Sequence, residues 1–263
     1  MSTKPIGILD SGFGGLSIYQ SIRELLPHES TIYVGDHAHI PYSTKTPSLI
    51  KRRVGKIIHF LLRKGAKLIV IACNTATVAG IDEYRKEFPG VPIVGVVPVV
   101  KTAAEVSGKK SFAVLSTQFT ADSAYQKNLI RRFAADCRVY NLRGHDLVDL
   151  VEKGVVKGIE IDRELKNILT PRMLEDVDVI ALGCTHYPFL RRAIRAIVGE
   201  NIRLLDSGGP VARQVRRILE HNKVMSSSKE PAHAFYSTGR KKHLSRLASE
   251  LLEETVTVQY ANI

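Results

Sequence analysis

The chain has 263 residues, a formal net charge of +12 and a hydrophobic fraction of 44%. This length suits two modest domains or one large α/β domain, and the composition is that of an ordinary globular protein, which excludes a disordered chain. The apolar runs at 68–73 and 91–100 are too short to span a membrane. No signal-peptide pattern opens the sequence, so we expect a cytoplasmic protein with no membrane partner.

Short apolar runs alternate with longer amphipathic segments along the whole chain. The apolar runs are nearly uninterrupted, as expected for strands that are covered on both faces, and this predicts an α/β fold with mostly parallel, doubly wound sheets. One helix is marked by Thr46 as its N-cap, Pro47 at its first position and Gly65 just past its end. In chain order, we predict a strand at 5–9, a helix at 16–26, a strand at 31–34, the helix that Thr46 caps, a strand at 68–72, a helix at 77–88, and then strands at 92–96, 112–115, 139–142, 179–182 and 203–205, each followed by a helical stretch.

Two breaks divide this series of elements. Val97-Pro98 follows the fourth predicted strand, and a glycine-rich segment at 206–210 precedes a new helix. Between these breaks lies about one domain's worth of strand–helix units. We therefore predict a first domain made of residues 1–97 plus 207–263, and a second domain, residues 98–206, inserted into it.

The two predicted domains repeat a sequence pattern. The segment ILDSG at 8–12 recurs as LLDSG at 204–208, and the run at 69–75 is echoed at 179–185. A duplicated α/β unit explains both pairs and predicts two pseudo-symmetric domains with their equivalent edges in opposition. The alternative is chance similarity, since buried strands are all rich in Val, Ile and Leu.

The three cysteines form no CxxC pair, so a functional cysteine must act through its thiol. Cys73 and Cys184 each follow a predicted strand and precede a predicted helix, at the strand ends where open α/β sheets bind ligands. A helix N-terminus lowers the pKa of a thiol, which can then act as a base near neutral pH. The alternative is that each is a small core residue. Cys137 has no such context and is predicted to be structural.

Polar side chains accompany the predicted strand ends. Asp10 and Ser11 follow the first strand and precede a glycine-rich turn, which lacks both the GxGxxG spacing and the GK[ST] motif of phosphate loops. A plain Asx-type turn is the alternative reading of these two residues. Hydrogen-bonding groups also lie beside the two cysteines, at Asn74, Thr75, Thr185 and His186.

Metal ligation is not predicted. The pair His37 and His39 is a weak metal signal by itself. Cys73, Cys184 and His186 could together form a catalytic zinc site, but no local ligand pair of familiar spacing supports it. The absence of a nucleotide fingerprint likewise suits an enzyme that works without a cofactor.

Six segments together resemble the signatures of the glutamate racemases, in the cofactor-independent aspartate/glutamate racemase family. They are DSG at 10–12 with GGLS at 14–17, GD at 35–36 with PY at 41–42, ACNTA at 72–76, and LGCTHYP at 182–188. They occur in the family's order and spread over nearly the whole chain. The resemblance implies two pseudo-symmetric α/β domains with the active site in the cleft between them.

The resemblance also implies an isomerase that interconverts L- and D-glutamate and supplies D-glutamate for peptidoglycan synthesis, cell wall biogenesis and cell shape. It implies that Cys73 takes the Cα proton from D-glutamate and Cys184 from L-glutamate, with Asp10 and His186 tuning these thiols. The implied partner is the small molecule glutamate; a homodimer is an open alternative, since the sequence does not reveal the oligomeric state. Ser43 stands where the family often has Gly, a change that a backbone N–H contact survives. The implied substrate contacts are Asp10, Ser11, Tyr42, Ser43, Asn74, Thr75, Thr117, Thr120, Thr185 and His186.

Two other functions are weighed against this one. An aspartate racemase of the same family shares the cysteine pair, but the sequence GCTH at 183–186 favours glutamate, because aspartate relatives usually differ after the threonine. The charge of +12 raises a nucleic-acid partner, yet the basic residues are scattered doublets and triplets such as 51–53, which are read as solvated helix faces. Aromatic residues make up only 6%, which supplies a base-stacking surface poorly.

Overall fold

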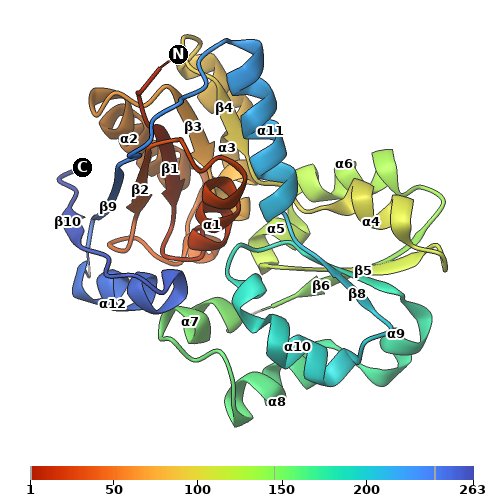
Figure 1. Cartoon of the computed structure of the whole chain (residues 1–263). Helices are drawn as coiled ribbons and strands as arrows, with labels where there is room; N and C mark the ends of the chain where they lie inside the picture. The colour runs from red at the N-terminus through yellow and green to blue at the C-terminus, as the bar shows by residue number, and fades with distance from the viewer. Residues whose placement is uncertain (1, 145, 240) are drawn as a thin grey trace. The chain divides into compact units, whose positions relative to one another are not determined.

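The computed structural model describes residues 2–144, 146–239 and 241–263. The chain divides into two compact units: unit 1 is Met1–Val96 with Gly208–Ile263, and unit 2 is Val97–Ser207. Each unit contains its own parallel β-sheet with helices on its faces (Figure 1). The predicted α/β class with parallel sheets is confirmed.

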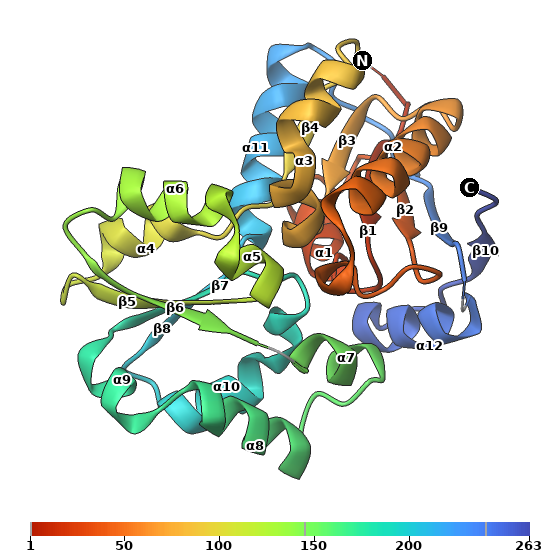
Figure 2. The same ribbon diagram turned by 180° about the vertical axis from the view of Figure 1, so that it is seen from behind.

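The sheet of unit 1 has six strands in the order β10-β9-β2-β1-β3-β4, and every pairing in it is parallel. Helices α1 and α11 pack together on one face, and α2 and α3 lie on the other (Figures 1 and 2). The elements of unit 1 are β1 (Ile6–Asp10), α1 (Leu16–Leu25), β2 (Thr31–Gly35), the 3-10 helix η1 (Tyr42–Thr44), α2 (Pro47–Arg63), β3 (Leu68–Ile71), α3 (Asn74–Glu87), β4 (Ile93–Gly95), α11 (Gly208–His221), β9 (His233–Ser237), α12 (Lys241–Leu252) and β10 (Val258–Tyr260).

The sheet of unit 2 has four strands in the order β6-β5-β7-β8, again all parallel. Helices α4 and α6 pack on one face, while α8, α9 and α10 lie toward the other (Figure 2). The elements of unit 2 are α4 (Val100–Val106), β5 (Ser111–Ser116), α5 (Gln118–Asp122), α6 (Ala124–Phe133), β6 (Arg138–Arg143), α7 (Leu147–Glu152), α8 (Ile159–Ile168), α9 (Pro171–Asp176), β7 (Val179–Leu182), the 3-10 helix η2 (Tyr187–Leu190), α10 (Arg191–Val198) and β8 (Arg203–Leu205).

The central strands form the core of each sheet because both of their faces are covered. Every residue of β1, β3 and β7 is buried, as the uninterrupted apolar runs predict. The predicted boundaries of α2 are also confirmed: the Thr46 side chain accepts a hydrogen bond from the Leu49 N–H, Pro47 opens the helix, and Gly65 follows its end with a φ of 86°.

Three features differ from the sequence prediction. Strands β9 and β10 were not predicted, since their residues are partly polar and partly exposed. Helix α3 begins at Asn74 rather than at residue 77, because the Cys73 side chain serves as its N-cap. The segment after Cys184 does not open an α-helix directly; the short helix η2 comes first, and α10 begins at Arg191.

A buried ion pair fastens α2 to the end of β2. The Arg53 guanidinium donates from Nε and Nη2 to the two carboxylate oxygens of Asp36, at 3.0 and 2.9 Å. Arg53 is 6% exposed and Asp36 0%. The prediction that the basic run at 51–53 is a solvated helix face is therefore wrong for Arg53. Burial would raise the pKa of Asp36, but hydrogen bonds from Arg53, Thr238 and Tyr42 outweigh it and hold that pKa below its ordinary value.

We expect Arg53→Leu to lower the free energy of unfolding by about 3–5 kcal/mol at neutral pH, because it leaves a buried carboxylate without its counter-ion. The measurement is denaturant unfolding. The matched control is Arg52→Leu at the exposed neighbouring position, which should change stability by less than about 0.5 kcal/mol. Equal losses of stability in Arg53→Leu and Arg52→Leu would contradict the assignment.

Since the pKa of Asp36 is lowered, the stability that its carboxylate contributes is present above the ordinary Asp pKa and is lost as pH falls through the lowered value.

Candidate active site

Parallel pairing gathers the predicted site residues of unit 1 at one sheet edge. Asp10 lies opposite Gly35 in the register of β1 and β2, and Leu9 lies opposite Ile71 of β3. The chain therefore leaves all three strands at the same level, where Ser11, Asp36 and Cys73 follow. This is the edge at which open α/β sheets bind ligands.

Cys73 is held at the N-terminus of α3. Its Sγ accepts a hydrogen bond from the Ala76 N–H at 3.5 Å, and its thiol can donate to Ser11 Oγ at 3.7 Å. The side chain is buried, with 5% of the residue exposed. An N–H donor at a helix N-terminus favours the thiolate over the thiol, so this position supports a cysteine that acts as a base.

Asp10 organises the turn beside Cys73. Its Oδ1 accepts from the Gly12 N–H at 2.7 Å, and the Tyr33 hydroxyl donates to the Gly12 carbonyl at 2.9 Å. The turn is tight: a Cβ on Gly15 would lie 2.7 Å from the Cβ of Asp10. The Asx-type turn that the sequence offered as an alternative is therefore present, and it fixes a buried carboxylate at the strand end.

Tyr42 and Ser43 open helix η1 above the same edge. The Tyr42 hydroxyl donates to Asp36 Oδ2 at 2.7 Å, and the residue is 1% exposed. Burial, together with the neighbouring Asp36 charge, raises the pKa of Tyr42, so its hydroxyl stays protonated. Because Asp36 already engages this hydroxyl, the groups at this place that best suit a ligand are the backbone N–H groups of the first turn.

Asn74 and Thr75 form the first turn of α3 with Cys73. The Asn74 amide donates to the Val96 carbonyl at 3.4 Å, which ties this turn to the end of β4. Thr75 is 4% exposed. Unit 1 thus brings Asp10, Ser11, Tyr42, Ser43, Cys73, Asn74 and Thr75 to a single edge of its sheet.

In unit 2, Cys184 belongs to a chain of three side chains. Its Sγ lies 3.7 Å from His186 Nδ1, and His186 Nε2 lies 2.7 Å from Glu152 Oε1. Cys184 is 6% and His186 2% exposed. The sequence predicted a helix N-terminus beside Cys184. The structure places the His186 imidazole there instead, and the Glu152 carboxylate contacts the other nitrogen of that ring.

Hydrogen bonding keeps His186 charged. Burial would lower the pKa of His186, but its hydrogen bonds to Cys184 and Glu152, and the negative charges of these groups, raise it well above the ordinary value. A doubly protonated ring donates from both nitrogens, so an imidazolium here can donate to Cys184 Sγ and to Glu152 Oε1.

Glu152 is a member of this arrangement that the sequence did not reveal. It is the last residue of α7, an amphipathic helix, and it lies 34 residues before His186. A single glutamate in such a helix carries no local signal, so only the fold brings it to the site. His145, which precedes this helix in the sequence, lies outside the described residues.

Thr117 and Thr120 lie at the end of β5, on the same edge as Cys184. Leu115 pairs with Leu182 in the sheet register, and Thr117 follows as the N-cap of α5. The Thr117 hydroxyl accepts from the Thr120 N–H at 3.3 Å and lies 3.1 Å from the Thr120 hydroxyl. Unit 2 thus brings Thr117, Thr120, Cys184, Thr185 and His186 to one edge.

The remaining predictions concern residues beside the site. His37 Nδ1 lies 3.1 Å from Ser237 Oγ, and His39 Nδ1 lies 3.2 Å from Asp36 Oδ1, so the Nδ1 atom of each ring has a protein partner. Within the described residues, no group of three His, Cys, Asp or Glu side chains is placed to hold a metal ion. Cys137 is partly exposed and packs against the hydrophobic core of unit 2. In the part of the chain that the structure describes, no helix is both long and apolar enough to cross a membrane.

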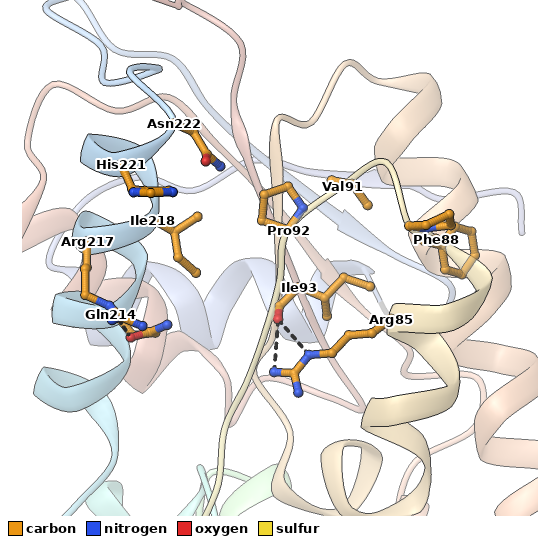
Figure 3. A pocket seen from close by; sticks show the side chains of 11 residues that line it. Arg85, Phe88, Val91, Pro92, Ile93, Gln214, Arg217, Ile218, His221 and Asn222 are labelled. Carbon is orange, nitrogen blue, oxygen red and sulfur yellow. Dashed lines mark hydrogen bonds between the residues drawn. The ribbon is translucent and has the colours of Figure 1, made fainter.

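A separate cavity of about 590 Å³ lies in unit 1, between the end of α3, β4 and the end of α11 (Figure 3). Arg85 lines it and donates to the Ile93 carbonyl at 3.4 and 3.3 Å, while Arg217 and His221 line it from α11. None of the predicted site residues line this cavity.

Comparison with known proteins assigns the family. The model of the Asp/Glu/Hydantoin racemase family matches residues 6–215. This match includes Cys73 and Cys184 and the strands that precede them. The chain belongs to the Asp/Glu/Hydantoin racemase family. The resemblance seen in the sequence is confirmed, as is the prediction of a racemase, an isomerase; the roles of individual residues stay predictions.

Individual relatives of this racemase agree over nearly the full chain. A glutamate racemase of Stutzerimonas stutzeri strain A1501 is 39% identical over 256 residues, which covers 97% of each chain. The structure of Francisella tularensis glutamate racemase with D-glutamate matches with a TM-score of 0.87 and 28% identity, covering 100% of this chain and 98% of that one. The structure of Escherichia coli glutamate racemase with L-glutamate and the activator UDP-MurNAc-Ala matches with a TM-score of 0.86 and 31% identity, covering 98% of each.

We expect Glu152→Gln to lower the pKa of His186 toward its ordinary range, because the carboxylate charge that favours the imidazolium is removed. The measurement is an NMR titration of the His186 ring. The raised pKa of His186 stabilises the folded racemase below the ordinary His pKa, and this contribution is lost as pH rises through the raised value. Glu160→Gln, at an exposed position of α8, is the matched control. An unchanged His186 titration in Glu152→Gln would show that the carboxylate does not hold the proton.

Proposed function

We propose that this racemase interconverts L- and D-glutamate in the cytoplasm by a cofactor-independent, two-base reaction. The observation that carries the proposal is a buried cysteine at a strand end in each unit, whose sulfur has a hydrogen-bond partner: the Ala76 N–H at Cys73 and the His186 ring at Cys184. The relatives whose structures contain D-glutamate and L-glutamate support glutamate as the substrate. Supply of D-glutamate for peptidoglycan synthesis is part of the same proposal and rests on the family.

The chemistry requires two bases on opposite faces of one carbon. Inverting Cα means that a proton leaves from one face and another arrives on the other face, so a single base would have to move around the substrate. In the proposed reaction, the Cys73 thiolate removes the Cα proton of D-glutamate and the Cys184 thiol delivers a proton to the opposite face. From L-glutamate, the two thiols exchange these roles. The residues gathered around each cysteine are called a half-site, and the reaction requires that both thiols act on the same substrate molecule.

Stabilisation of the carbanion must come from fixed polar groups. The Cα proton is very weakly acidic, so positioning and preorganised electrostatics have to supply much of the barrier reduction. The hydroxyls of Ser11, Thr75, Thr117 and Thr185 and the backbone N–H groups of Ser43 suit the two carboxylates of glutamate. In the proposal, Asp10 and His186 tune the thiols next to them.

We expect Cys73→Ser and Cys184→Ser each to lower racemisation at least about 100-fold, because a hydroxyl is a far weaker base than a thiolate. The assay follows optical rotation of purified protein with L-glutamate, in EDTA and with no added cofactor. Cys137→Ser is the matched control and should retain nearly full activity. Full activity in either of the first two variants would refute the two-base account, and zinc-dependent activity would support a metal site in its place. Faster turnover of aspartate than of glutamate would favour the aspartate racemase alternative.

We also expect D-glutamate formed from L-glutamate in D₂O to carry deuterium at Cα from the first turnovers. The product proton comes from the second thiol, which exchanges with solvent, whereas the substrate proton stays on the first. Mass spectrometry of the separated enantiomers at low conversion measures this, with the unreacted L-glutamate as the internal control. Transfer of the substrate's own proton into the product would indicate a single base.

A further inference from the structure

Helix α3, which carries Cys73 at its N-terminus, is bent inside its second turn. Gly80 has φ −174° and ψ 30°, which are not helical values. The bend has a visible cause, since glycine is a frequent site of helix kinks. The first turn of α3 is therefore oriented separately from the rest of the helix.

The bend allows Tyr84 to reach back to the first turn. The Tyr84 hydroxyl donates a hydrogen bond to the Ala76 carbonyl at 3.3 Å, although the two residues are 8 positions apart. In a straight helix this separation is about 12 Å along the axis, farther than a tyrosine side chain extends. A Cβ on Gly80 would lie 3.1 Å from Tyr84 Cζ and 3.0 Å from Lys51 Cγ, so the glycine also leaves room for the ring.

Ala76 links Tyr84 to the Cys73 thiol. Its N–H donates to Cys73 Sγ at 3.5 Å, while its carbonyl accepts from the Tyr84 hydroxyl. Cys73, Ala76 and Tyr84 are 5%, 0% and 1% exposed, so the whole chain of contacts is shielded from water. Ala76 thus accepts a hydrogen bond from Tyr84 at its carbonyl and donates one to the Cys73 sulfur from its N–H.

Two further residues anchor this turn. Asn74 donates to the Val96 carbonyl, and Thr77 Oγ1 accepts from the Val96 N–H at 3.1 Å and lies 3.4 Å from the Ile71 carbonyl, to which it can donate. The Thr77 N–H, which shares a peptide group with the Ala76 carbonyl, donates to the Cys73 carbonyl at 2.9 Å. Tyr84 adds a side-chain hydrogen bond to the Ala76 carbonyl itself. Burial raises the pKa of Tyr84, with the nearby Cys73 as a smaller cause, which keeps the hydroxyl protonated as a donor.

We propose that Tyr84 is a positioning residue for Cys73: by holding the Ala76 carbonyl, it keeps the Ala76 N–H directed at the sulfur and so favours the thiolate. Its importance for catalysis rests on the proposed role of Cys73 as a base. The effect of Tyr84 on the Cys73 thiol is independent of the proposed function, because the reactivity of the thiol can be measured without any racemisation.

The test compares Tyr84→Phe with Tyr19→Phe, a matched control that removes the hydroxyl of another fully buried tyrosine in unit 1. The rate at which iodoacetamide alkylates Cys73 is followed across pH by peptide mass mapping, and Cys184 on the other unit serves as an internal reference. We expect the Cys73 rate at neutral pH to fall roughly tenfold in Tyr84→Phe, with its pH profile displaced upward. Both Tyr19→Phe and the Cys184 reference should stay unchanged.

Racemisation is measured in parallel. We expect kcat/KM to fall by a similar factor for both enantiomers, because the equilibrium between enantiomers does not favour either one. A Tyr84→Phe variant that melts earlier but keeps the wild-type Cys73 pH profile would overturn the proposal and leave Tyr84 a purely structural residue. If Tyr84→Phe does not fold, the test uses Gly80→Ala, whose added Cβ presses on the Tyr84 ring while the hydroxyl is kept. An upward displacement of the Cys73 pH profile in this variant would support the proposal, and an unchanged profile would overturn it. If the Cys73 profile shifts and no racemisation is detected in the wild type, the positioning role stands and the proposed function fails.

Discussion

Parallel strand pairing is the constraint on which both the core and the candidate site depend. It requires helices on both faces of each sheet, and this explains why β1, β3 and β7 are apolar throughout. The same geometry sends all carboxyl strand ends to one edge, so residues far apart in the sequence become neighbours there. Asp10, Asp36 and Cys73 meet for this reason alone. A site built this way is positioned by the most buried elements of its unit.

The two cysteines share a place in the fold but not a means of stabilising negative charge. A backbone N–H of α3 donates to Cys73, so a neutral dipole acts on that thiol. At Cys184 the neighbour is the His186 ring, a titratable group whose pKa is raised by its hydrogen bonds to Cys184 and Glu152. The repeated sequence pattern at 69–75 and 179–185 therefore corresponds to equivalent strands and equivalent cysteine positions. The groups that contact the two sulfurs are not equivalent.

The sequence predicts what depends on local pattern and misses what depends on distant contacts. The central strands and the caps of α2 follow from apolar runs and from Thr46, Pro47 and Gly65. Strands β9 and β10, at one end of the sheet, lack such runs, and neither is fully buried. Glu152 carries no signal until the fold brings it to His186. The same holds for the side chains that meet at Asp36, where Thr238 donates from 202 positions away. The motif resemblance points to the two cysteines and to His186, but not to Glu152, which contacts His186.

The buried polar groups of each half-site find their partners within the same unit. Asp36 is satisfied by Arg53, Tyr42 and Thr238, all in unit 1, while His186 is satisfied by Glu152 and Cys184, both in unit 2. Buried charges with such partners avoid the cost of desolvation without compensation and need little reorganisation when a ligand arrives. Each unit therefore presents a preformed arrangement around its own thiol. A substitution that weakens one of these networks should leave the other thiol's surroundings intact, so the reactivity of the second cysteine becomes a direct measure of whether damage has stayed within one unit.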